Sequence, residues 1–144
     1  MNNKEFDERQ NFIRGKIFYH MYIILAILLL LNAFLTDSGI AWADGFCSSI
    51  IILMTATAIG SVEAIVRGVY FVNPRRIVIS VIMTLCGIML IIATFVQFID
   101  GDTVLSNGQL TQEGFFLIMS ILFSVIGISG IIKTIYDKFN KSEE

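Results

Sequence analysis

Two stretches of this sequence contain no lysine or arginine, although each separates two long apolar runs. Residues 36–45 and 100–114 carry only acidic charges, which belong to Asp37, Asp44, Asp100, Asp102 and Glu113. All ten basic residues lie in the terminal segments or around the other ends of the runs. Because basic residues in short loops stay on the cytoplasmic side of a membrane, the distribution predicts a polytopic membrane protein with both termini in the cytoplasm.

Cysteine and histidine are also scarce, and their scarcity excludes several kinds of site. Cys47 and Cys86 form no Cys-x-x-Cys pair and are expected at different depths, so we predict neither a thiol oxidoreductase nor a disulfide. A single histidine, His20, leaves no ligand set for a metal ion. The sequence also has no HExxH motif and no glycine-rich phosphate loop. We therefore predict no enzyme, no cofactor and no metal.

Apolar residues dominate the composition and are concentrated in four runs. They make up 56% of the chain, and mean hydropathy is +0.78, whereas a water-soluble domain is about 45–50% apolar. A bilayer core about 30 Å thick needs about 20 apolar residues as helix. We predict an all-α, four-helix transmembrane bundle with spans at about 17–35, 46–71, 77–99 and 115–135. Because the connections are short, successive spans should be antiparallel neighbours.

The segments outside this membrane domain (17–135) are predicted to be cytoplasmic. Residues 136–144 form a polar tail. In residues 1–16, Lys4 and Glu8, and then Glu5 and Arg9, have the i,i+4 spacing that supports a helix. This helix would be either an amphipathic segment on the membrane surface or an extension of the first span into the cytosol. The formal charge of -2 argues against binding of nucleic acid.

Three connections carry local structural motifs. Asp44 is placed to cap the second helix with its carboxylate. Asn73-Pro74 should open the third helix, with the proline in its first turn. Asn107-Gly108 is typical of a two-residue hairpin turn, which predicts a small β-hairpin on the outer face.

Glu63 is the residue that most suggests a function, since it lies within an apolar run. A carboxylate in the hydrocarbon region is costly and indicates a functional site, such as the coupling group of a proton-driven transporter. Alternatively, Glu63 and Arg67 pair along one helix at i,i+4 spacing. A third hypothesis adds His20, expected at similar depth, in a polar cluster that senses pH or holds a lipid headgroup.

A ridge of small residues runs along the second span at four-residue spacing: Ala56, Gly60, Ala64 and Gly68. Such a ridge allows another helix to approach closely. Ser120, Ser124 and Gly127 offer a similar surface in the fourth span. Each surface could pack within the chain or across a dimer.

Two short segments carry a resemblance to known proteins. Asp7-Glu8-Arg9-Gln10, followed by Ile13-Arg14-Gly15-Lys16-Ile17, resembles the start of small Gram-positive membrane proteins of unknown function, in which an Asp-Glu-Arg segment leads into the first of four spans. Glu63-Ala-Ile-Val-Arg67-Gly68-Val-Tyr70 resembles the same group. The resemblance implies a bacterial plasma membrane and no particular activity. It also suggests one shared cytoplasmic surface, with Asp7 or Glu8 paired to Arg67, Arg75 or Arg76.

The sequence as a whole favours a non-enzymatic membrane protein with an accessory, regulatory or immunity-type role. Its partners would be the lipid bilayer and another membrane protein or a second copy of itself. The alternative is a small proton-coupled transporter or channel, acting as a homo-oligomer with Glu63 as its coupling carboxylate.

Overall fold

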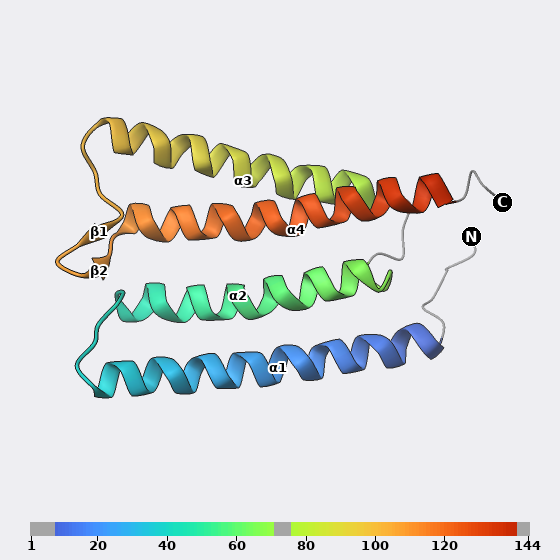
Figure 1. The fold of residues 1–144 in the computed structure, drawn as a ribbon, viewed down its shortest axis with the longest axis horizontal. Coiled ribbons are helices and arrows are strands. Elements are labelled where there is room, and N and C mark those ends of the chain that lie inside the picture. Colours follow the sequence, from blue (N-terminus) through green and yellow to red (C-terminus); the bar gives the residue numbers. More distant parts are fainter. Residues whose placement is uncertain (1–7, 71–75, 141–144) are drawn as a thin grey trace.

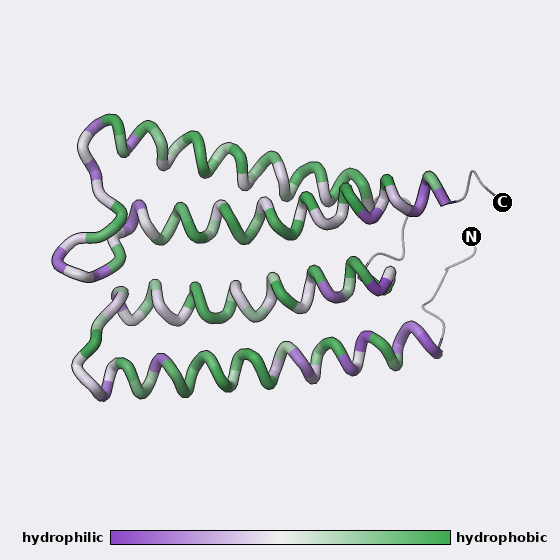
Figure 2. Tube along the Cα trace, in the orientation of Figure 1, coloured by the Kyte–Doolittle hydropathy of each residue, from purple (hydrophilic) through white to green (hydrophobic). Residues whose placement is uncertain are grey.

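The computed structural model describes residues 8–70 and 76–140, and it confirms the all-α fold class. Each of the four helices is long and apolar enough to cross a membrane. The elements in chain order are α1 (Glu8–Asp37), α2 (Gly45–Val66), α3 (Arg76–Ile99), β1 (Leu105–Ser106), β2 (Gln109–Leu110) and α4 (Gln112–Asn140). Figure 2 shows that the middle of each helix is apolar, whereas hydrophilic residues gather at the helix ends and in the loops.

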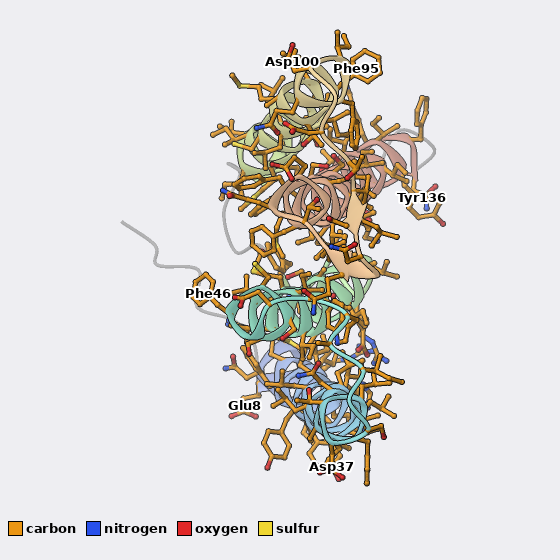
Figure 3. All side chains as sticks on the ribbon, turned by 90° about the vertical axis from the view of Figure 1, so that its left-hand side faces the viewer. Glu8, Asp37, Phe46, Phe95, Asp100 and Tyr136 are labelled. Carbon is orange, nitrogen blue, oxygen red and sulfur yellow. The ribbon has the colours of Figure 1, made fainter. Side chains whose placement is uncertain are left out.

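The helices form one open layer in the order α1, α2, α4, α3 (Figure 1). The view along the helix axes shows them stacked in a single column, with side chains projecting from both of its sides (Figure 3). Successive helices run antiparallel, and α1 begins at the end of the layer where α4 finishes. The prediction that the second and third spans are neighbours is wrong, because α4 lies between them.

α2 ends earlier than predicted. We predicted a span reaching residue 71, but α2 ends at Val66. Gly68 adopts a positive φ of 71°, and the Val69 amide donates to the Ala64 carbonyl at 2.9 Å. The Gly68 amide donates to the Ile65 carbonyl at 3.0 Å, which completes a Schellman motif. Nine residues, 67–75, lie between the end of α2 and the start of α3 in the sequence.

The two terminal helices are longer than the predicted spans. α1 is a continuous helix of 30 residues from Glu8, about 45 Å at helical rise. Residues 8–16 are therefore helical and continue into the first predicted span without a break. α4 continues to Asn140, so residues 136–140 of the predicted tail are helical. Asn73 and Pro74, predicted to open the third helix, lie outside the described residues.

The closest packing in the layer joins α3 to α4. A Cβ atom on Gly127 would lie 2.6 Å from the Thr84 amide nitrogen and 2.8 Å from the Ser80 carbonyl oxygen. One on Gly87 would lie 2.9 Å from the Ser120 carbonyl oxygen. The surface predicted at Ser120, Ser124 and Gly127 therefore packs within the chain. The facing residues of α3, which are Ser80, Thr84 and Gly87, were not predicted to be a packing surface.

The loops at the other end of the layer are joined by backbone hydrogen bonds. The predicted hairpin is present, and Asn107 and Gly108 both have the positive φ that its turn requires, 50° and 81°. The Leu110 amide donates to the Trp42 carbonyl at 2.7 Å, which links the hairpin to the α1–α2 connection. Asp44 caps α2 as predicted, because its carboxylate accepts from the Phe46 amide at 3.1 Å.

Candidate functional site

Glu63, Arg67 and His20 form a polar cluster at the seam between α1 and α2. Glu63 lies in the last turn of α2, and its Oε1 is 2.7 Å from a terminal nitrogen of the Arg67 guanidinium, at the C-cap of the same helix. His20 projects from α1 and places Nδ1 3.3 Å from Oε1 and 3.2 Å from Oε2 of Glu63. The structure therefore brings together all three residues that the sequence singled out.

The charges of this cluster offset one another near the end of α2. The partial negative charge of a helix C-terminus favours a cation such as Arg67 and disfavours an anion such as Glu63. Arg67 and His20 supply the compensating donors to that carboxylate. The Glu63 side chain is 23% exposed, whereas those of Arg67 and His20 are 44% and 47% exposed. The carboxylate is thus the most covered member of an exposed cluster.

The cluster also lies close to the helix end. Glu63 is three residues from the last residue of α2, about 5 Å along the helix axis. Within residues 8–70 and 76–140, no three His, Cys, Asp or Glu side chains are grouped closely enough to hold a metal ion. The arrangement can hold a charge or a proton at one end of the layer.

The small-residue ridge of α2 is shorter than predicted. A Cβ atom on Gly60 would overlap the Met21 side chain, so this residue packs against α1 within the chain. Ala56 is buried, and Ala64 is partly buried. Gly68 does not belong to the ridge, because it lies beyond the end of the helix and its Cβ would meet no atom within 4 Å. Gly68 instead supplies the positive φ that the Schellman motif at the end of α2 requires.

A cavity of about 320 Å³ lies between α1 and α2, and the sequence did not predict it. Arg14 and Tyr70 line it, together with mainly apolar or small residues of both helices, among them Phe18, Met21 and Ala64. None of the three residues of the polar cluster lines this cavity. Only the four-residue spacing of Gly60 and Ala64 pointed to this region, and that spacing indicated close packing rather than a cavity.

The proposed pairing of Glu8 with Arg67 is not made. Arg67 binds Glu63 instead. Glu8 begins α1 twelve residues before His20, about 18 Å from it along the helix, which leaves Glu8 too far from the end of α2. Asp7 and Arg75, the other residues of that hypothesis, lie outside the described residues, and so does the Arg76 side chain.

Comparison with known proteins finds no match for this chain. No protein family, no curated protein and no solved structure matches this chain.

Proposed function

We propose that this chain is a non-enzymatic, integral membrane protein with an accessory, regulatory or immunity-type role. It acts through lateral contacts with another membrane protein or with lipid, rather than by moving a solute. The open layer of four helices is the observation that carries this proposal. A layer one helix thick has two broad faces and two free edges, and each is available for contact within the bilayer.

The edge formed by α1 is the best surface for such a contact. Among the residues that the structure describes, α1 packs mainly on α2, and 6% of the residues in its apolar segment are buried. Large side chains along it are exposed, including Phe18, Tyr22 and Leu30. Association between membrane helices depends on close packing and polar contacts, and an unpartnered helix of this length offers room for both.

The same geometry disfavours the transporter alternative. A single layer encloses no path, so transport would need several copies. The carboxylate that would couple transport to protons, Glu63, already accepts bonds from Arg67 and His20 near the end of α2. A coupling carboxylate must exchange its proton for substrate during the cycle, and an ion-paired one at the helix end is poorly suited to that exchange.

We further propose that the acidic loops face outward and that both ends of the described chain, Glu8 and Asn140, face the cytoplasm of a bacterium. The support is the absence of lysine and arginine from the 36–45 and 100–114 connections. α1 begins at the end of the layer where α4 finishes, so Glu8 and Asn140 lie at the same end, as this orientation requires. The bacterial plasma membrane follows only from the resemblance of the Asp7–Ile17 segment.

Site-specific photocrosslinking in native membranes tests the proposed role. A photoreactive residue at Tyr22 or Leu30 on the α1 edge should give a stoichiometric adduct with a different membrane protein or with lipid. The matched control is Ile52 of α2, which is buried and does not line the cavity between α1 and α2, so only crosslinks within the chain are expected there.

Two results would contradict the proposal. An adduct of twice the mass of the chain, formed from both exposed positions, would favour a homo-oligomer and raise the transporter alternative. Proton-coupled uptake by the purified protein in vesicles, abolished by Glu63→Gln, would establish that alternative.

A further inference from the structure

The cavity between α1 and α2 combines an apolar wall with polar groups at one end. Phe18 and Met21 line it from α1, and Gly60 and Ala64 line it from α2. Arg14 lies about one turn closer to the start of α1, and Tyr70 follows the end of α2. Since these two helices are antiparallel, Arg14 and Tyr70 lie at the same end of the cavity. The lining is therefore amphipathic along the helix axis.

Small side chains on α2 make this space. Ala64 extends no farther than Cβ, and Gly60 has no side chain, so the Met21 side chain of α1 can lie directly against the α2 backbone beside the cavity. The cavity volume of about 320 Å³ falls at the lower end of the range of small-molecule sites, about 300–1,000 Å³. Because the layer is one helix thick, a cavity at this seam borders the lipid beside the layer.

The end of the layer that holds Arg14 is basic. Glu63 and Asp137 there are ion-paired with Arg67 and Lys133. The other charged side chains described at this end are those of Glu8, Arg9, Arg14, Lys16 and Lys138, so cations exceed acids. A guanidinium has five N–H donors, so Arg14 can keep a partner within the chain and still bind a phosphate.

We propose that this cavity binds an anionic phospholipid of the leaflet at the basic end. The phosphate is held by Arg14, with the Tyr70 hydroxyl beside it, and one acyl chain lies against Phe18, Met21 and Ala64. Basic pockets between transmembrane helices on the cytoplasmic side are known sites for anionic headgroups. The inference deepens the proposed function by naming a lipid and a site, and it does not depend on any protein partner.

Native mass spectrometry of the detergent-purified protein tests this site. Phosphatidylglycerol and phosphatidylcholine with identical acyl chains are added in equal amounts, and the retained lipid is counted. The unaltered protein should retain one phosphatidylglycerol in preference to phosphatidylcholine. Arg14→Gln should reduce this preference about fivefold, the factor for about 1 kcal/mol per basic residue near an anionic surface. Arg9→Gln is the matched control, because it removes the same charge from an exposed position outside the cavity.

A second variant keeps the test decisive if Arg14→Gln does not fold, as judged by its circular dichroism. Ala64→Phe fills the cavity without changing charge, and it should abolish the retained lipid. Phosphatidylglycerol retained by either variant with unaltered preference would overturn the site. An equal loss with Arg9→Gln would also overturn it, since the whole basic end would then attract lipid without a specific cavity. If the lipid site is overturned, a protein adduct in the photocrosslinking experiment at the α1 edge would still support the proposed function.

Discussion

Gly127→Ala should separate α3 from α4 and destabilise the protein by about 1–3 kcal/mol, the usual cost of adding a group to a close-packed seam. The added methyl group would meet backbone atoms of α3, which lie 2.6 Å and 2.8 Å from the ideal Cβ position. Backbone atoms cannot rotate away as a side-chain tip can, so the helices must move apart. The loss should appear as unfolding at a lower mole fraction of sodium dodecyl sulfate, followed by circular dichroism in mixed micelles.

The same substitution at Gly15 is the matched control. Gly15 is also within a helix, but a Cβ atom there would meet nothing within 4 Å. Alanine is favoured over glycine in a helix interior by up to about 1 kcal/mol, so Gly15→Ala should leave stability unchanged or raise it slightly. Equal stability of the Gly127→Ala and Gly15→Ala proteins would show that α3 and α4 are not in the close contact described.

Glu63→Gln should destabilise the protein by about 1.5–3 kcal/mol, the range for hydrogen bonds to a charged group. The change removes the negative charge that lies 2.7 Å from the Arg67 guanidinium, and it replaces one of the two carboxylate oxygens that face His20 Nδ1 with an NH2 group, which cannot accept a hydrogen bond. The loss should be measured by the same unfolding titration. Proton uptake into vesicles should equal the protein-free background for both proteins, because we assign Glu63 to charge compensation.

The double variant Glu63→Gln, Arg67→Gln separates pairing from other effects of the glutamine. Removing one partner leaves an uncompensated charge, whereas removing both does not. The double variant should therefore be more stable than the sum of the two single losses predicts. Additive losses would mean that the two side chains do not interact. Flux that disappears with Glu63→Gln, without loss of stability, would assign the carboxylate to transport.

Much of the local structure was predictable because its determinants are close together in the sequence. Charge distribution and run length predicted four helices. The Asp44 cap and the Asn107-Gly108 turn each depend on a few consecutive residues, and both are present. The Glu63–Arg67 pair followed from i,i+4 spacing, and the placement of His20 beside it followed from matching depth along the two helices.

The order of the helices was not predictable in this way. In a bilayer the surrounding lipid is as apolar as the helix faces, so association depends on close packing and polar contacts between particular pairs. The sequence displays the small residues of each helix but not their partner, and thus the α3 side of the Gly127 contact was missed. Gly68 was placed in a packing ridge because its spacing fitted, whereas its positive φ of 71° ends α2. The α1–α2 cavity arises from two helices together and has no motif of its own.

Accessibility of single cysteines in intact cells tests most directly whether four helices cross the bilayer with the acidic loops outside. Cys47 and Cys86 are replaced by serine, and one cysteine is introduced as Ser106→Cys or Asn140→Cys, both at exposed positions at opposite ends of the layer. A maleimide that cannot enter cells should label the Ser106→Cys protein at once and the Asn140→Cys protein only after the membrane is permeabilised. The reverse pattern would contradict the proposed orientation, and labelling of both in intact cells would contradict the four crossings themselves.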